Sequence, residues 1–169
     1  MFWFLKIDWW WVPLSKGRFS SVSVCDIDRT KSRRWRAFWH SRRRVWYALG
    51  YGPLGEGRGT IFLHRWITNA PLGKEVDHVD HNTLDNRRHK LRVCSRSQNQ
   101  WNSLVRKDNT SGFKGVYKNR CNGRWQARIR VEGRLMGLGY FDRAEDAAKA
   151  YDKAAIKRGG EFARLNFPA

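Results

Sequence analysis

Hydrophobic and polar residues alternate most regularly between positions 124 and 131. The odd positions are all apolar, whereas the even positions are Arg124, Gln126, Arg128 and Arg130. Because successive side chains of a β-strand point to opposite faces, this pattern predicts a strand with one apolar face and one cationic face.

Strands over residues 113–118 and 134–141 are expected to flank it. Asn122-Gly123 and Glu132-Gly133 fit the hairpin turns between them. A helix is predicted next, with Asp142 as its N-cap, Glu145 completing a capping box, and Gly159-Gly160 ending it. Alanines at helical spacing indicate that this helix packs closely against the sheet.

The N-terminal half is predicted to form short strands and turns. Residues 19–24 alternate, residues 45–49 are β-prone, and five glycines between 50 and 59 predict a loop. Residues 61–69 are expected to form a short helix that Pro71 and Gly73 close. For the three tryptophans at 9–11 we favour buried positions in a strand over a membrane interface.

The charge identifies the class of partner. The chain of 169 residues has 34 Lys and Arg against 15 Asp and Glu, a net charge of +19. This excess predicts a polyanionic partner, most commonly nucleic acid. It divides into +9 over residues 1–76, +3 over 77–110 and +7 over 111–169. The ten tryptophans and nine phenylalanines exclude disorder throughout.

Cysteines and hydropathy exclude several other classes. Cys25, Cys94 and Cys121 are odd in number and form no C-x-x-C pair, which predicts a reducing, cytoplasmic setting without a disulfide framework or zinc ribbon. The apolar run at residues 1–5 is interrupted by Lys6 and Asp8. It is too short for a signal peptide or a membrane span, so no membrane association is expected.

The C-terminal residues 111–169 resemble the DNA-binding domain of ethylene-response-factor (APETALA-type) proteins. The resemblance rests on Gly115-Val116, Gly123-Arg124-Trp125, Leu138-Gly139-Tyr140-Phe141, Ala147-Ala148-Lys149-Ala150-Tyr151-Asp152 and Leu165-Asn166-Phe167-Pro168. In that family the sheet lies in the major groove of DNA. The resemblance therefore implies DNA contacts from Lys114, Tyr117, Arg124, Arg128, Arg130 and Arg134. Plant members carry arginine where this chain has Tyr117, so their sequence preference does not transfer.

The central segment resembles the HNH nucleases of phages and introns. The matching residues are Asp77-His78, Asp85-Asn86-Arg87-Arg88, Leu91-Arg92 and Gln98-Asn99-Gln100-Trp101-Asn102. The resemblance implies that His78 is the general base and that Asp77 and Asn99 are ligands of one divalent metal ion, Mg²⁺ or Mn²⁺, in each active site. Oxygen ligands suit such a hard cation, and a neutral imidazole suits the activation of water.

Lys90 departs from this family pattern. The family carries asparagine at this position, twelve residues after the base, where it ties the loop together and orients the histidine. A lysine only donates hydrogen bonds and adds a positive charge near the metal. Either Asn86 or another group compensates, or activity is reduced or lost.

The other histidines carry weaker signals. His81 stands where the family usually has glycine; a loop position is expected, with a phosphate or metal contact as the alternative. His89 is expected on the surface, and His64 is expected to pack rather than to act in catalysis. No role is assigned to His40.

These observations predict an α+β fold with a ββα-metal nuclease unit at its centre. The expected parts are a β-rich N-terminal region (1–72), the HNH unit (73–106), a linker (107–111) and the DNA-binding domain (112–169). The predicted function is a metal-dependent homing-type endonuclease on double-stranded DNA, phage- or intron-encoded, without an obligatory protein partner. The alternatives are a catalytically impaired, sequence-specific DNA-binding protein and an RNA- or ribosome-associated basic protein.

Overall fold

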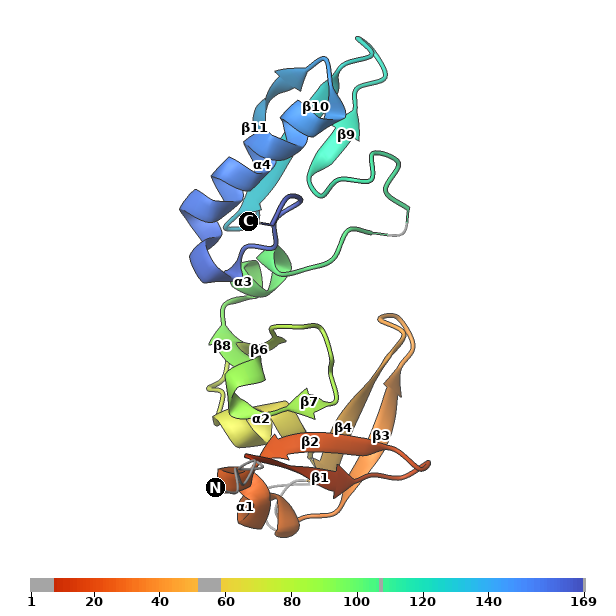
Figure 1. Cartoon of the computed structure of the whole chain (residues 1–169), viewed down its shortest axis with the longest axis vertical. Helices are drawn as coiled ribbons and strands as arrows, with labels where there is room; N and C mark the ends of the chain where they lie inside the picture. The colour runs from red at the N-terminus through yellow and green to blue at the C-terminus, as the bar shows by residue number, and fades with distance from the viewer. Residues whose placement is uncertain (1–7, 52–58, 107, 169) are drawn as a thin grey trace, which may run out of the picture. The chain divides into compact units, whose positions relative to one another are not determined.

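The computed structural model describes residues 8–51, 59–106 and 108–168 (Figure 1). The chain divides into two compact units, Met1–Val93 and Cys94–Ala169. Both units mix helices with small sheets, which agrees with the predicted α+β class.

The first unit contains three small sheets. Its elements are β1 (Trp9–Pro13), β2 (Phe19–Ser23), α1 (Ile27–Lys31), β3 (Trp35–His40), β4 (Val45–Tyr51), β5 (Thr60–Phe62), α2 (Leu63–Thr68), β6 (Glu75–His78), β7 (Asp85–Asn86) and β8 (Leu91–Cys94, which ends at the unit boundary). The strand orders are β1-β2-β7, β3-β4-β5 and β6-β8. β2 pairs antiparallel with β1 and parallel with the two-residue strand β7.

The core of this unit joins the sheets to α2. Val22, Leu63 and Ile67 are almost completely buried in one apolar cluster. A buried ion pair adds a polar tie, because Arg88 donates to both carboxylate oxygens of Asp26 at 2.7 and 2.8 Å. Since Asp26 is 1% exposed, this pair fixes the segment before β8 to the N-terminal region.

Most elements expected in this unit are confirmed. β2 and β4 lie at the predicted positions. The helix expected over 61–69 is shorter, because residues 61 and 62 belong to β5. In the expected glycine loop, Gly50 belongs to β4, and residues 52–58 lie outside the described part of the chain.

The burial expected for the N-terminal tryptophans is wrong. They do form a strand, but Trp10 and Trp11 are 58% and 53% exposed. β1 is an edge strand of its sheet, and Trp11 packs edge-on against Trp9 and Phe19 outside the core.

The second unit is built on one antiparallel sheet. Its elements are α3 (Arg96–Trp101), β9 (Val116–Lys118), β10 (Trp125–Val131), β11 (Arg134–Phe141) and α4 (Ala144–Gly159). β10 is the central strand, and α4 packs along the sheet (Figure 1). The alternation predicted for β10 is confirmed, since Ala127 and Ile129 are buried and Arg130 is exposed.

The capping prediction for α4 is wrong. The N-cap residue is Arg143, which makes no side-chain cap hydrogen bond. Asp142 instead accepts a hydrogen bond from Arg124 Nε at 2.9 Å. The end of the helix at Gly159 and Gly160 is confirmed.

A close approach at Gly115 ties α4 to the sheet. Gly115 has φ +74°, and a Cβ placed there would lie 2.0 Å from the ring of Tyr151, a residue of α4. Only glycine permits both the left-handed backbone and this contact.

We expect Gly115→Ala to destabilise the second unit by at least about 2 kcal/mol, because it adds a steric clash to backbone strain. Gly123→Ala is the matched control, since Gly123 has φ +68° with open space around it. Gly123→Ala should lower the free energy of unfolding only by the backbone strain, about 1 kcal/mol. Urea unfolding measures both; equal losses would contradict the role of the Tyr151 contact.

Candidate active site

Asp77 and His78 lie next to each other on β6 and are both buried, with 4% and 7% of their surfaces exposed. Asp77 Oδ2 accepts a hydrogen bond from Arg92 Nη2 of β8 at 2.5 Å. This ion pair fixes the direction of the buried carboxylate.

His78 is held by Asn86 of β7. The distance from His78 Nε2 to Asn86 Oδ1 is 3.3 Å, and Asn86 is 1% exposed. Burial lowers the pKa of His78 below its ordinary value, although the hydrogen bond with Asn86 and the charge of Asp77 oppose this. The imidazole is therefore neutral at pH 7, as a general base must be.

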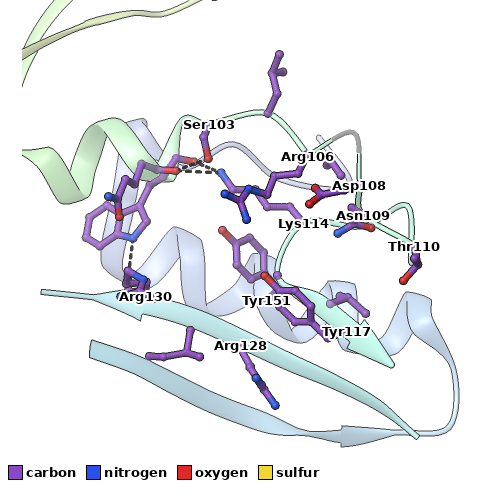
Figure 2. A pocket seen from close by; sticks show the side chains of 17 residues that line it. Ser103, Arg106, Asp108, Asn109, Thr110, Lys114, Tyr117, Arg128, Arg130 and Tyr151 are labelled. Carbon is purple, nitrogen blue, oxygen red and sulfur yellow. Dashed lines mark hydrogen bonds between the residues drawn. The ribbon is translucent and has the colours of Figure 1, made fainter. Parts of the chain in front are cut away.

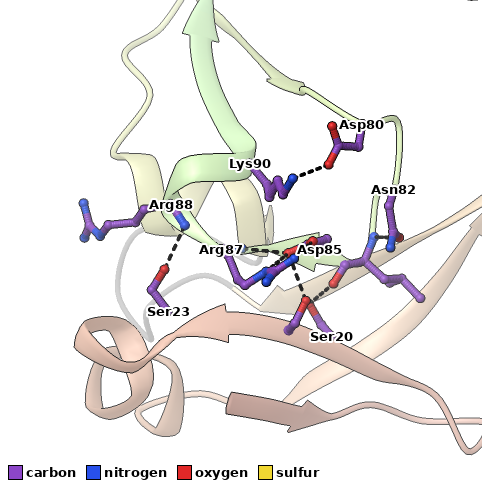
Figure 3. Close-up of polar contacts among 10 residues, drawn as sticks. Ser20, Ser23, Asp80, Asn82, Asp85, Arg87, Arg88 and Lys90 are labelled. Atoms are coloured by element: carbon purple, nitrogen blue, oxygen red, sulfur yellow. Dashed lines mark hydrogen bonds and ion pairs between the residues drawn. The ribbon is translucent and has the colours of Figure 1, made fainter. Parts of the chain in front are cut away.

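The loop between β6 and β8 closes without an asparagine at position 90. The backbone carbonyl of Lys90 accepts a hydrogen bond from Val79 N at 3.0 Å. The Lys90 ammonium pairs with Asp80 Oδ2 at 2.5 Å, as Figure 3 shows. A neighbouring carboxylate thus offsets the charge that Lys90 introduces.

The same loop explains the position of His81. Its backbone has φ +61°, and its N–H donates to the carbonyl of His78 at 3.0 Å. A left-handed backbone favours glycine, which accounts for the residue that the family usually carries here.

Ion pairs and serine contacts hold β7 in place. Burial alone would raise the pKa of Asp85, but hydrogen bonds from Arg87 and Ser21 lower it below its usual range. Arg87 donates to both carboxylate oxygens of Asp85, at 2.8 and 2.6 Å (Figure 3). These contacts fix the strand that carries Asn86.

Asn99 lies on α3, in the second unit. Its helix begins with a capping box between Ser95 and Gln98. Trp101 ties this helix to the rest of the second unit, since its indole donates to the carbonyl of Arg130 at 3.0 Å. The pairing of Asn99 with Asp77 around a metal ion stays a prediction.

His64 packs against the candidate base. Its ring lies edge-on to His78 with centroids 5.1 Å apart, and it stacks on Phe62 at 5.3 Å. Tyr47 contacts both histidine rings. The packing of His64 was expected, but the sequence gives no signal for its contact with His78. His89 is exposed, as expected.

In the second unit, aromatic and cationic side chains share the outer face of the sheet. Arg128 donates to Gln126 Oε1 from Nε at 2.7 Å and lies over the ring of Tyr117 at 5.7 Å. Arg130 donates to the carbonyl of Gly133 at 2.8 Å. Tyr117 is half-exposed and pairs in register with Gln126. We call Tyr117, Arg128 and Arg130 the outer face.

The other three predicted DNA contacts differ in their surroundings. Arg124 bonds Asp142 at 2.9 Å. Arg134 pairs in register with Val131, so its side chain leaves the sheet on the opposite side from Arg128. Lys114 donates to the carbonyls of Gln100 and Trp101, inside a cavity of about 680 Å³ that Tyr117 and Tyr151 also line (Figure 2). Burial lowers the pKa of Lys114 to about 8.

Comparisons with known proteins identify relatives of both segments of the chain. Residues 61–101 match the family model described as HNH endonuclease. Protein 3.8 of Escherichia phage T7 is 32% identical over 95 residues, which cover 56% of this chain and 78% of that protein. An uncharacterized HNH endonuclease of Acanthamoeba polyphaga mimivirus is 33% identical over 129 residues, which cover 72% of this chain and 66% of the relative.

The C-terminal region has relatives of another kind. APETALA2-like protein 2 of Oryza sativa is 46% identical over 63 residues, which cover 34% of this chain and only 14% of the plant protein. The chain therefore belongs to the HNH endonuclease family and combines an HNH segment with an APETALA2-like DNA-binding domain. Among the described helices, none has the length and hydropathy needed to cross a bilayer.

His64 should make the stability of the fold depend on pH. Burial first, and then electrostatic interactions with His78, Arg65 and Arg43, lower its pKa from 6.5 to about 3. Between these values the unfolded chain binds one more proton than the folded chain. The free energy of unfolding should therefore fall with decreasing pH, by up to about 1.4 kcal/mol per unit from this group.

We expect His64→Phe to remove this part of the slope below neutral pH, as measured by urea unfolding at several pH values. His89→Phe, at an exposed position, is the control and should follow the unaltered chain. If the free energy of unfolding depends on pH in the same way for all three proteins, protonation of His64 does not destabilise the fold.

Proposed function

We propose that this protein is a metal-dependent endonuclease of the homing type that hydrolyses phosphodiester bonds in double-stranded DNA. The observation that carries the proposal is the buried pair Asp77 and His78, with His78 held by Asn86 at 3.3 Å. The proposed parts are the N-terminal region (1–72), a ββα-metal unit (73–106), a linker (107–111) and a DNA-binding domain (112–169).

In this proposal His78 is the general base. Its neutral imidazole accepts a proton from the attacking water, an effect worth roughly 10²–10⁴-fold in rate. The surrounding Tyr47 and His64 rings exclude solvent on one side of His78 and keep the imidazole in place. The Arg92 guanidinium fixes the direction of Asp77.

The donor set suits a hard divalent cation, Mg²⁺ or Mn²⁺. Among the described residues no group of three or more His, Cys, Asp or Glu side chains gathers as a metal site. A cation that retains several waters needs only one or two protein oxygens, and Asp77 with Asn99 would provide a carboxylate and an amide oxygen. When bound, the cation offsets negative charge on the phosphate and the leaving oxygen.

Two contacts favour activity over the impaired alternative. Asp80 offsets the charge of Lys90, and Asn86 provides an amide oxygen to His78. The backbone of Lys90 still closes the loop through Val79. The loop thus has replacements for both functions that the family assigns to asparagine at position 90.

We propose that the outer face of the second unit binds DNA. The positive charge of Arg128 and Arg130 complements phosphate, and the exposed ring of Tyr117 can contact sugar or base. Lys114, Arg124 and Arg134 remain proposed contacts, although Lys114 donates to a backbone carbonyl, Arg124 pairs with Asp142, and the strand register of Arg134 places it on the opposite side of the sheet from Arg128. Because protein 3.8 is a phage protein, we place the activity in the cytoplasm of a host cell.

The nuclease proposal predicts that purified protein nicks or linearises plasmid DNA when Mg²⁺ or Mn²⁺ is added. His78→Ala should reduce the cleavage rate by at least about 100-fold, because the general base is removed. The measurement is conversion of supercoiled plasmid with time, with a chelator as the control.

His89→Ala is the matched variant and should cleave at the unaltered rate, since His89 is exposed in the loop. No cleavage by the unaltered protein at any metal concentration would refute the nuclease proposal. DNA binding without cleavage, followed by cleavage in Lys90→Asn, would support the impaired alternative.

The DNA-binding proposal predicts a steep dependence of affinity on salt. Replacing Arg128 and Arg130 with alanine should reduce the log–log slope by about 0.9 for each phosphate that these side chains neutralise. The measurement is fluorescence anisotropy of a labelled duplex at several salt concentrations.

The control removes the same charge from α4, which packs on the other side of the sheet, by Lys153→Ala with Lys157→Ala. An equal slope for the two double variants would mean that the outer face makes no specific contribution. A tighter complex with duplex RNA than with duplex DNA would favour an RNA-associated protein.

A further inference from the structure

A continuous row of buried hydrogen bonds connects the candidate base to the N-terminal sheet. His78 Nε2 lies 3.3 Å from Asn86 Oδ1, and Asn86 Nδ2 donates to Ser20 Oγ at 2.7 Å. Ser20 Oγ donates in turn to the carbonyl of Leu84 at 2.8 Å. Ser20 is completely buried, and Asn86 is 1% exposed, so water does not compete for these bonds.

The carbonyl at the end of this row determines the direction of every hydrogen bond. A backbone carbonyl only accepts, so the one hydroxyl hydrogen of Ser20 points to Leu84. Towards Asn86, Ser20 can then only accept. The NH₂ group of Asn86 must face Ser20, and its oxygen must face His78.

This order decides which nitrogen of His78 carries the proton. An amide oxygen accepts only, so His78 Nε2 must donate, and the neutral ring carries its hydrogen there. Nδ1 is then the unprotonated nitrogen. A general base needs its lone pair on one defined nitrogen, because only that atom can accept the proton of a correctly placed water.

We propose that Ser20 is a positioning residue that selects the Nε2–H tautomer of His78 through Asn86. The inference rests on the proposed nuclease function for its consequence in catalysis, but the selection of the tautomer is a property of the folded chain. The inference assigns the N-terminal sheet a role in the site, because Ser20 lies outside the HNH segment at residues 61–101.

The pairing of β2 with β7 places Ser20 where this selection requires it. Ser21 and Val22 pair in register with Asp85 and Asn86. The carbonyl of Leu84 also accepts a hydrogen bond from Ser21 N at 3.0 Å, so its direction is set by the sheet. The serine hydroxyl therefore meets a fixed acceptor rather than a mobile one.

Removing the Ser20 hydroxyl should allow the side-chain amide of Asn86 to adopt either orientation. In Ser20→Ala the NH₂ group of Asn86 loses its acceptor, and the two ends of the amide are nearly equal in shape. A reversed amide presents NH₂ to His78, which favours an unprotonated Nε2 and a proton on Nδ1. The ring would then present the wrong nitrogen to water.

The decisive measurement is ¹⁵N NMR of the full chain with labelled histidine, at a pH where His78 is neutral. His78→Ala identifies the signal. The unaltered chain should show the Nε2–H tautomer, and Ser20→Ala should shift the population towards Nδ1–H. Ser23→Ala is the matched control on the same strand, since the Ser23 hydroxyl accepts from Arg88 N, outside the row that leads to His78, and its loss should leave the tautomer unchanged.

Plasmid cleavage adds a second readout. Ser20→Ala should lower kcat by about tenfold or more with little change in KM, because DNA binding is unaffected. If the unaltered protein does not cleave DNA but its tautomer responds to Ser20→Ala, the nuclease proposal fails while the selection of the tautomer stands.

Three outcomes would overturn the inference. The first is an Nδ1–H tautomer in the unaltered chain, a result that does not depend on whether Ser20→Ala folds. The second is an unchanged tautomer in folded Ser20→Ala. Adding Asn86→Asp to Ser20→Ala should restore Nε2–H, because a carboxylate presents an acceptor to His78 in either orientation. Failure to restore it is the third outcome that would overturn the inference.

Discussion

The parallel pairing of β2 with β7 is the constraint on which the candidate active site depends. β7 has only two residues, Asp85 and Asn86, and such a short segment has no stability of its own. Its position is fixed by backbone pairing with Ser21 and Val22 and by the serine hydroxyls of β2. Each of these polar groups is buried, so losing one partner would leave another unsatisfied at a cost of about 1–3 kcal/mol.

The pairing of charged side chains around His78 is the second constraint on the candidate site. The chain carries +19, yet the groups around His78 are paired within short range. Asp77 is paired with Arg92, Lys90 with Asp80, and Asp85 with Arg87. The excess positive charge is consequently available elsewhere, including the outer face of the second unit. A strongly basic chain can therefore still provide a carboxylate and a neutral imidazole in the same buried place.

Much of the fold could be predicted from local patterns. The alternation in β10 and the turns beside it depend on neighbouring residues, and the structure confirms them. The errors arose where a distant residue decided the outcome. Arg124 binds Asp142 and removes it as a helix cap, and β1 lies at a sheet edge where Trp10 and Trp11 stay exposed. A bulge in the pairing near Ala127 and the register at Arg134 are likewise invisible in a periodic pattern.

The sequence by itself determined the family, the order of its two segments, the basic face of β10 and the residues of the Asp-His motif. These follow from motif identity and from strand periodicity, which are properties of neighbouring positions. Only the tertiary structure decided that Asp80 forms an ion pair with Lys90 and that the rings of His64 and His78 pack together. It also decided that Ser20 accepts a hydrogen bond from Asn86, which lies 66 positions away in the sequence. Such contacts depend on how separate strands pair in space, because hydrogen bonds and ion pairs act over a few ångströms regardless of distance along the chain.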